Sequence, residues 1–356
     1  YIGGQIGDRV RRPLMLYGVL EIGIALCALA FPQIIFGLDD IYRAIYQESF
    51  ATQPFKYQAF RVVVSSLTLL APTILMGATL PLLIRQFARK EMEFGRQVAF
   101  FYAVNTLGAF VGTLLAGFIL LQALGMQNTN TANLLVNLAI GVTALLVSVY
   151  DLGVTPYKPE TATPALTSNP SGNTLVLGSN KVVVGVAIAL SGLSALALEV
   201  VWTRVLVQSF SGTVHAFAVM LACFLFGIFY GSRKMEKEID SNRNPVALLY
   251  ILELWLAGSV ALLAPLTFVV PSLVGALTWS ITGLSGGNFA TGSVVAQFVI
   301  ASLFISGPTI LLGATFPVAA KAFTGDIRER ANGTGSVYAA NTAGAMLGAL
   351  LGGFVL

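Results

Sequence analysis

Two stretches of this 356-residue chain are copies of one another, and they decide its fold. Residues 72–120 contain PTILMGATLP followed by YAVNTLGAFVGTLLAGF, and residues 308–356 contain PTILLGATFP followed by YAANTAGAMLGALLGGF. The two stretches align at a constant offset of 236 residues without a gap, and 22 of 49 positions are identical. Unrelated apolar helices share composition, but they do not share ordered runs of Gly, Ala, Thr, Pro, Tyr and Asn. We therefore interpret the pair as an internal duplication.

The composition is that of a protein with many membrane spans. Hydrophobic residues make up 56% of the chain and charged residues 10%, whereas soluble domains carry about 25% charged residues. The mean hydropathy is +0.81. Runs of about 20 apolar residues, the length that crosses a bilayer, recur along the chain. They predict nine spans, at about 13–30, 60–88, 98–124, 131–150, 182–207, 214–229, 245–270, 294–323 and 336–356.

The order of these spans predicts an all-α integral membrane fold with two parallel copies of a six-helix bundle, in a major-facilitator-like plan. The duplication extends to PLMLYGVLE at residues 13–21, which resembles PVALLYILE at residues 245–253. Spans without a visible counterpart are expected to have counterparts before Tyr1 or after Leu356. The intact unit would then be six helices that occur twice in the same orientation. Residues 1–150 form the first repeat, 151–180 a linker rich in Pro, Thr and Ser, and 181–356 the second repeat.

Charge predicts the orientation in the membrane. If residues 1–12 are cytoplasmic, alternating spans place sixteen of the 20 Lys and Arg residues on that side and four on the other. Such an asymmetry is typical of the cytoplasmic face, so residues 1–12 and 151–180 are both expected to be cytoplasmic. The net charge of +4 is spread over short loops between apolar runs, which argues against nucleic acid as a partner and for the lipid bilayer.

Small residues and prolines recur at equivalent positions of the two copies. Glycines four residues apart predict helix-packing seams, in which small side chains let backbones approach closely; they are Gly108 and Gly112 in the first copy and Gly344, Gly348 and Gly352 in the second. Pro81 and Pro317 each remove a helix hydrogen bond and free the carbonyl four residues earlier, which Thr79 and Thr315 could help to satisfy. Each proline is interpreted as a fixed bend, with a moving hinge as the alternative.

Amides and acids inside the spans are the candidate binding residues. Asn105 and Asn341 are equivalent in the two copies, and each is either an interhelical clamp or a substrate contact. Glu21 and Glu253 are also equivalent and could face each other across a pseudo-twofold axis; Glu199 is the third acid. Acids at membrane depth either bind a cation, relay a proton or lock helices together by hydrogen bonds.

No catalytic motif is recognisable, and the sequence predicts neither a cofactor nor a metal site. The chain contains no Walker loop, GxSxG or HExxH motif. Its two cysteines, Cys27 and Cys223, lie in apolar segments and are interpreted as buried apolar side chains. The single histidine, His215, has no neighbouring acid or cysteine and is interpreted as structural.

Two resemblances to known families add to this interpretation. GGQIGDRVRR, in which Gly4, Asp8, Arg9, Arg11 and Arg12 carry the match, resembles the loop signature of the major facilitator superfamily. SGLSALALEVVWTRVL at 191–206, the GATLP and GATFP segments and the paired YAxNTxGAxxG segments resemble the membrane region of bacterial fused spermidine-synthase-like proteins. That resemblance implies a location in the bacterial inner membrane. It also implies an aminopropyltransferase-like domain after Leu356, where any enzymatic activity would reside.

Three functions remain open at this point. The chain could be the membrane domain of a spermidine-synthase-like protein, which anchors a soluble enzyme domain and handles its substrate or product. It could be a major-facilitator-like transporter of a small cationic solute, with Glu21, Glu199 and Glu253 along the path. It could also be a structural subunit of a larger membrane complex, in which the glycine seams and apolar surface are contacts.

Overall fold

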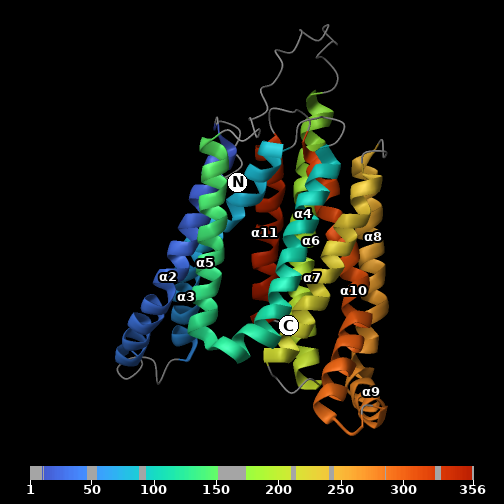
Figure 1. The fold of residues 1–356 in the computed structure, drawn as a ribbon. Coiled ribbons are helices and arrows are strands. Elements are labelled where there is room, and N and C mark those ends of the chain that lie inside the picture. The colour runs from blue at the N-terminus through green and yellow to red at the C-terminus, as the bar shows by residue number, and fades with distance from the viewer. Residues whose placement is uncertain are drawn as a thin grey trace.

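The computed structural model describes residue 10 and residues 12–45, 54–87, 94–150, 174–209, 214–239, 244–284, 286–324 and 330–354. All regular elements in these residues are helices: α2 (Pro13–Ile45), α3 (Pro54–Phe87), α4 (Phe94–Leu115), η3 (Ala116–Leu120), α5 (Leu121–Val149), α6 (Thr174–Ser209), α7 (Val214–Glu238), α8 (Pro245–Leu263), η4 (Ala264–Val269), α9 (Val270–Leu284), α10 (Phe289–Phe323) and α11 (Arg330–Phe354). The long helices run side by side in an elongated bundle (Figure 1). Most of residues 1–12, including Gly4, Asp8, Arg9 and Arg11 of the major-facilitator-like signature, lie outside the described residues.

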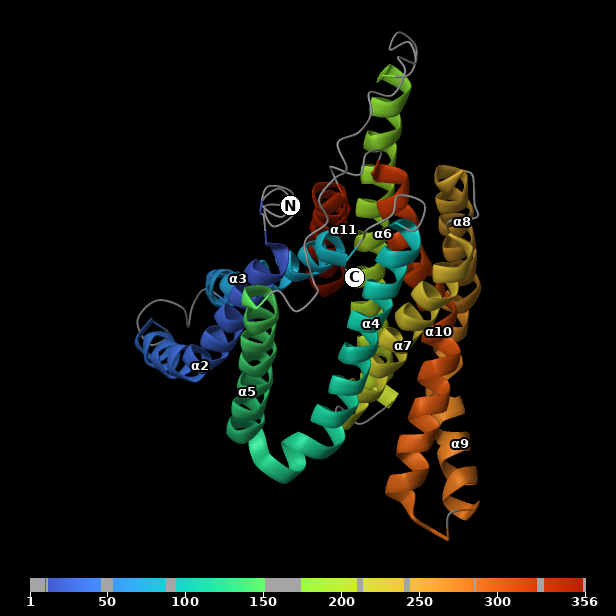
Figure 2. The same cartoon turned by 45° about the horizontal axis from the view of Figure 1, so that its top comes forward.

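Eight helical segments within the described residues are long and apolar enough to cross a membrane, so the chain is a multi-pass membrane protein. One of them, Phe94–Val149, contains α4, the π-helical η3 and α5, and it turns back on itself as a U (Figure 2). Inside it Gly125 leaves the helical conformation at φ 73°, where a residue with a side chain would be strained. Because its two arms correspond to the predicted spans 98–124 and 131–150, the eight segments account for all nine predicted spans.

Two predicted boundaries differ from the structure. The first span, predicted to end at about residue 30, continues through Pro32 to Ile45 as α2, and Ile41 and Tyr42 belong to its last turns. Asp39 and Arg43 form a 2.8 Å ion pair one turn apart, and Tyr42 packs edge-on against Phe60 of α3, so this end of α2 has its own stabilising contacts. The helix α6 begins at Thr174, inside the stretch predicted as linker, and residues 151–173 lie outside the described part of the chain.

One helix contact within the first sequence copy has a counterpart in the second. In the first repeat α2 packs against α3 and α5, and in the second α8 packs against α10. The alignment of the two copies makes α3 the counterpart of α10 and α4 the counterpart of α11. Between the repeats α3 packs against α11, and α4 packs against α10 and α7. The two inter-repeat pairs α3–α11 and α4–α10 are therefore related by the duplication.

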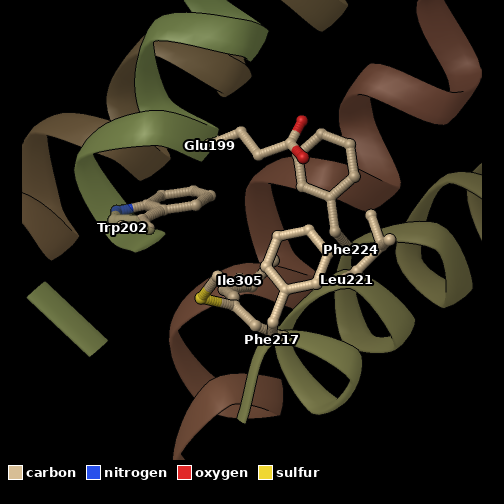
Figure 3. Close-up of a pocket in the computed structure, with 7 residues that line it drawn as sticks. Glu199, Trp202, Phe217, Leu221, Phe224 and Ile305 are labelled. Atoms are coloured by element: carbon tan, nitrogen blue, oxygen red, sulfur yellow. The ribbon is translucent and has the colours of Figure 1, made fainter. Parts of the chain in front are cut away.

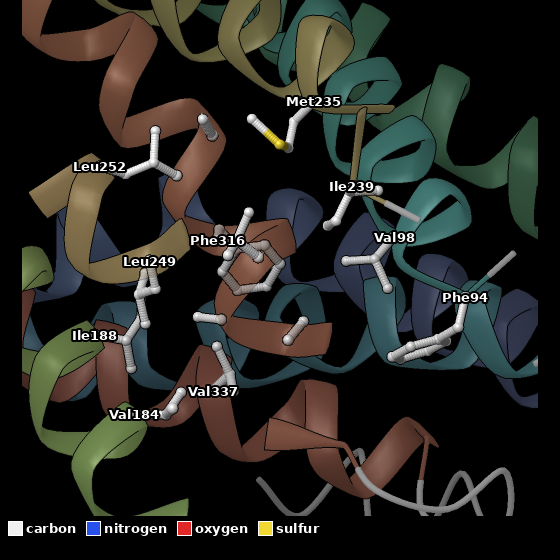
Figure 4. Close-up of a cluster of buried hydrophobic side chains, with 14 of the residues drawn as sticks. Phe94, Val98, Val184, Ile188, Met235, Ile239, Leu249, Leu252, Phe316 and Val337 are labelled. Atoms are coloured by element: carbon white, nitrogen blue, oxygen red, sulfur yellow. The ribbon is translucent and has the colours of Figure 1, made fainter. Parts of the chain in front are cut away.

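A buried hydrophobic cluster joins the two repeats (Figure 4). It contains Leu80 of α3 and Phe316 of α10, which occupy equivalent positions of the two copies. Tyr102 of α4 stacks on Phe316 with ring centroids 4.5 Å apart, and Tyr338, the counterpart of Tyr102 on α11, meets the same ring edge-on at 5.9 Å. Repeat-related side chains thus meet where the two halves touch.

The buried residues of a second hydrophobic cluster come from α6, α7, α8, α9 and α10, and Phe118 of η3 packs against them. It includes Trp202 of α6, Phe224 of α7 and Ile305 of α10, which are 5%, 8% and 1% exposed. This packed cluster forms the floor of the cleft described next.

Candidate functional site

Glu199 of α6 lies at the edge of a small cleft between α6, α7 and α10 (Figure 3). The remaining lining residues are apolar or aromatic: Trp202, Phe217, Met220, Leu221, Phe224 and Ile305. The Glu199 carboxylate lies beside the Phe224 ring, with the Phe217 ring and the Trp202 indole around the same space (Figure 3). A carboxylate and aromatic rings both attract a cationic group.

The Glu199 carboxylate has no hydrogen bond or ion pair with any described residue. The hydroxyl of Thr203 donates a 2.6 Å hydrogen bond to the main-chain carbonyl of Glu199, not to its side chain. The nearest basic residue in sequence, Arg204, donates from Nη2 to the carbonyl of Gly353 on α11. Arg204 is therefore not the counterion of Glu199, and the cleft beside the carboxylate has a volume of about 10 Å³, enough for one water molecule.

The structure does not bring Glu21 and Glu253 together. Their helices, α2 and α8, lie on opposite sides of the bundle in both views (Figures 1 and 2), which corrects the expectation that the two acids face each other. The physical reason is that α2 packs mainly against α3 and α5 of the first repeat, and α8 mainly against α10 of the second.

Each of these two acids is instead held within its own half. Glu21 is 8% exposed and accepts a hydrogen bond from the Tyr17 hydroxyl one turn earlier on α2. Glu253 accepts a hydrogen bond from the hydroxyl of Ser191 on α6, whereas its buried Oε1 has no hydrogen-bond partner among the described residues. Glu21 is thus buried and Glu253 half-buried in helix contacts.

The two amides have different surroundings although they are equivalent in the repeat. Asn341 lies against Gly192 of α6, where an added Cβ would stand 2.7 Å from the Asn341 Oδ1 and 2.1 Å from its main-chain oxygen. Asn105 on α4 is exposed. Neither amide lies in the Glu199 cleft.

The glycines of the two predicted helix-packing seams also have different surroundings in the two copies. A Cβ at Gly344 would stand 1.7 Å from the carbonyl oxygen of Ala189, and one at Gly348 would stand 2.0 Å from that of Leu193, both on α6. Gly352 continues this seam, with the Ala197 carbonyl 3.1 Å from an added Cβ. In contrast, Gly108 and Gly112 on α4 have no described atom within 4 Å of an added Cβ.

Pro81 and Pro317 both lie inside continuous helices, α3 and α10. The hydroxyls of Thr79 and Thr315 bond the carbonyls of Met76 and Leu312, each at 2.7 Å, and not the carbonyls that the prolines free. The carbonyl freed by Pro317, that of Gly313, instead accepts a 2.6 Å hydrogen bond from the hydroxyl of Ser232 on α7.

A glycine seam between α7 and α10 was not predicted from the sequence. Gly227 and Gly231 of α7 face Gly313 and its neighbours on α10, where added Cβ atoms at the three glycines would stand 1.9, 1.9 and 2.1 Å from atoms of the opposite helix. The signal was available, because GIFYG at residues 227–231 is a pair of small residues four apart in an apolar helix.

A charged cluster near the ends of α4 and α7 was also missed. Glu236 is 8% exposed and pairs with Arg233 on its own helix and with Arg96 on α4, where Arg96 Nε lies 3.6 Å from Glu236 Oε1. Close by, Lys321 of α10 donates a 2.6 Å hydrogen bond to the carbonyl of Ile239. Through the contact with Arg96, Glu236 links α7 of the second repeat to α4 of the first. The sequence around Glu236 indicates only a charged loop.

The lone histidine lies at a helix junction. His215, at the start of α7, contacts Gln122 of α5 and packs edge-on against Phe118, with ring centroids 5.2 Å apart. Within the described part of the chain, no group of three or more His, Cys, Asp or Glu side chains could hold a metal ion.

Comparison with known proteins does not assign the chain to a family. No protein-family model matches the chain, and no curated protein matches it.

Proposed function

We propose that the chain is the membrane domain of a spermidine-synthase-like protein, which anchors a soluble aminopropyltransferase-like domain and handles a small cationic solute. In this proposal the bundle has a major-facilitator-like plan, with two repeats in the same orientation in a bacterial inner membrane. The solute would be the substrate or product of the soluble domain. The same bundle acting alone would be a transporter of that solute.

The observation that carries this proposal is the reciprocal packing of repeat-related helices. The packing of α3 on α11 and of α4 on α10 is what a twofold relation between two like bundles produces. Two pairs of repeat-equivalent residues lie in or against the hydrophobic cluster at this boundary: Tyr102 with Tyr338, and Leu80 with Phe316. Carriers built from tandem repeats place their solute between the halves and move one half against the other.

The acids favour a cationic solute. Glu21, Glu199 and Glu253 all lie in spans, where a carboxylate is costly unless it has a role or a partner. Glu21 and Glu253 have hydroxyl donors, which is sufficient for a structural role. Glu199 has no such partner among the described residues, so it is the acid that best fits a cation.

One observation favours the structural alternative, a subunit of a larger membrane complex. Asn105 is exposed, and Gly108 and Gly112 on the same helix face no described atom, although their counterparts in the second copy are covered by α6. A helix of another chain could cover this part of α4. Stable co-purification with a large complex, together with no movement of solute, would favour this alternative.

The proposed function is tested by uptake into proteoliposomes that contain the purified full chain. Radiolabelled spermidine is the probe, and protein-free liposomes and the Asp39→Asn variant are the controls, since Asp39 is an exposed acid in a surface ion pair. We expect saturable uptake that Glu199→Gln reduces by about tenfold or more and Asp39→Asn leaves unchanged. If uptake equals that of empty liposomes for spermidine and for other small organic cations, the chain does not handle a cationic solute.

A further inference from the structure

We infer that the groove between α2 and α3 binds one phospholipid of the leaflet that surrounds it, with an acyl chain along the groove and the phosphate beside Arg43. This inference goes beyond the proposed function and does not rest on it. A transporter, a membrane anchor and a structural subunit are all compatible with such a lipid site.

The groove lies between the second half of α2 and the first half of α3, which run side by side (Figures 1 and 2). Its volume is about 280 Å³, whereas the cleft at Glu199 has about 10 Å³. Sites that enclose a whole small molecule typically have about 300–1,000 Å³. Because this groove is open along one side, it can hold one flexible chain of a ligand while the rest of the ligand lies outside.

The lining of the groove changes from apolar to polar along its length. Phe31 and Leu69 lie toward one end, and Tyr42 and Ser65 toward the other, with the remaining lining residues Ile35, Leu38, Asp39 and Thr68 between them. From Phe31 to Tyr42 the helix α2 rises by about 16 Å, which is close to the ~15 Å hydrocarbon depth of one leaflet. The groove therefore matches an acyl chain in length.

The polar end of the groove points toward the headgroup layer. The 33 residues of α2 extend over about 50 Å, which exceeds the ~30 Å hydrocarbon core, so the last turns of a tilted α2 still reach the headgroups. Tyr42 lies in these turns, and tyrosine is typical of the membrane–water interface. The groove thus follows the order of a phospholipid, from hydrocarbon chain to charged headgroup.

Basic side chains gather at the polar end. The sequence places four Lys and Arg residues on the side expected to be non-cytoplasmic, and three of them, Arg43, Lys56 and Arg61, lie on α2 and α3 next to this end. The described acids there are Asp39 and Asp40. Three positive charges against two negative ones favour an anionic group, which in a membrane is the phosphate of a lipid.

Arg43 is well placed to hold that phosphate. It follows Tyr42 directly, its side chain is 77% exposed, and its Nη2 lies 2.8 Å from Oδ2 of Asp39. A guanidinium has five N–H donors, so this ion pair leaves donors that can bind phosphate oxygens. The Asp39 carboxylate would repel a phosphate, so Asp39 holds Arg43 in position and is not itself a contact of the lipid.

The test measures lipid binding to the full chain by native mass spectrometry, in a detergent that removes loosely bound lipid. The probe is dioleoylphosphatidylglycerol, and the dissociation constant of the first bound lipid is determined. Dioleoylglycerol is the matched probe, because it has the same two chains and no phosphate. Circular dichroism shows that each variant keeps its helices. We expect one phosphatidylglycerol to bind about fivefold or more tightly than dioleoylglycerol.

A pair of serine variants tests the place of the acyl chain. Ser65→Phe puts a ring into the groove and should weaken binding of the first phosphatidylglycerol by about tenfold or more. Ser66→Phe adds the same ring at the next residue, which is exposed and does not line the groove, so it should leave binding unchanged.

A pair of variants of one ion pair tests the place of the phosphate. Arg43→Gln should weaken phosphatidylglycerol binding by roughly fivefold and leave dioleoylglycerol binding unchanged. Asp39→Asn breaks the same ion pair but keeps the Arg43 charge, so binding should be unchanged or tighter. If the ion pair only stabilised the end of α2, the two variants would have equal effects.

Each part of the inference has a result that overturns it. Equal binding by Ser65→Phe and Ser66→Phe would show that no acyl chain lies in the groove. Equal binding of phosphatidylglycerol and dioleoylglycerol, or equal losses in Arg43→Gln and Asp39→Asn, would show that Arg43 does not hold a phosphate. Co-purification of another membrane protein that Ser65→Phe abolishes, with no lipid bound, would assign the groove to a partner helix and overturn the lipid site.

Discussion

The hydroxyl of Ser232 on α7 donates a 2.6 Å hydrogen bond to the main-chain carbonyl of Gly313 on α10, four residues before Pro317. Because Pro317 has no N–H, that carbonyl lacks its usual helical donor, and Ser232 replaces it from the neighbouring helix. Ser232 is 0% exposed, so Ser232→Ala should leave a buried carbonyl without its donor and lower the free energy of unfolding by about 1–3 kcal/mol.

A double-mutant cycle isolates this relationship. In Pro317→Ala the restored N–H can bond the Gly313 carbonyl, so the added cost of Ser232→Ala should fall below about 1 kcal/mol. Ser280→Ala is the matched control, because Ser280 is exposed and bonds only a carbonyl of its own helix. An equal cost of Ser232→Ala with and without Pro317 would show that the serine does not replace the missing donor.

The repeat-equivalent glycines Gly344 and Gly108 should respond oppositely to the same substitution. A Cβ at Gly344 would stand 1.7 Å from the Ala189 carbonyl oxygen, so Gly344→Ala must separate α11 from α6 and should destabilise by roughly 1–3 kcal/mol. Gly108→Ala meets no described atom within 4 Å and should be neutral or stabilising by up to about 1 kcal/mol, because alanine favours the helix. Unfolding midpoints in detergent measure the stability of both variants. A large loss of stability in Gly108→Ala would reveal a helix packed on α4.

Glu236 should contribute more to stability than its exposed partner Arg96. The Glu236 side chain is 9% exposed, and Glu236→Gln removes the negative charge that pairs with Arg233 and Arg96. We expect the free energy of unfolding to fall by about 1–3 kcal/mol. Arg96 is 61% exposed, so Arg96→Gln should cost less than about 1 kcal/mol, and high salt should reduce that cost further. Chemical unfolding at low and high potassium chloride measures both losses of stability. A larger loss in Arg96→Gln than in Glu236→Gln would contradict the prediction and would indicate that the Arg96 contact alone holds α4 to α7.

Ser191 and Glu253 should behave as a structural lock between α6 and α8. Ser191 is 3% exposed and donates to the Glu253 carboxyl, so Ser191→Ala should destabilise by about 1–2 kcal/mol. In a Glu253→Leu background the cost should largely vanish, because replacing both polar partners by apolar groups is nearly neutral. Ser194→Ala, at an exposed position of the same helix, is the control. Additive effects of the two substitutions would contradict the lock.

The sequence allowed the membrane spans and one glycine seam to be predicted, because both depend on local patterns. Apolar runs give the spans directly, and glycines four apart on α11 form a seam wherever a helix is present to cover them. The same pattern on α4 faces no described atom, since periodicity specifies a helix face but not its neighbour.

The arrangement of the acids could not be predicted from the sequence. Glu21 and Glu253 are equivalent in the duplication, but equivalence does not place α2 and α8 side by side, and each helix packs within its own half. The cleft at Glu199 depends on side chains from α6, α7 and α10 that are far apart in sequence. Likewise, the contact of Ser232 with the Gly313 carbonyl required knowledge of which face of α7 meets α10.

The central claim is that the two repeats meet through repeat-related helices, with Tyr102 of α4 stacked on Phe316 of α10 at 4.5 Å. Cysteine cross-linking in native membranes tests it most directly, in a full chain that lacks Cys27 and Cys223 and carries a protease site between residues 151 and 173. Tyr102→Cys with Phe316→Cys is the test pair. Glu21→Cys with Glu253→Cys is the control pair, because α2 and α8 lie on opposite sides of the bundle.

After treatment with a short bismaleimide and cleavage of the linker, the two halves of the test pair should migrate as one species. The halves of the control pair should separate. Separation of the Tyr102–Phe316 pair together with cross-linking of the Glu21–Glu253 pair would contradict the arrangement of the two repeats.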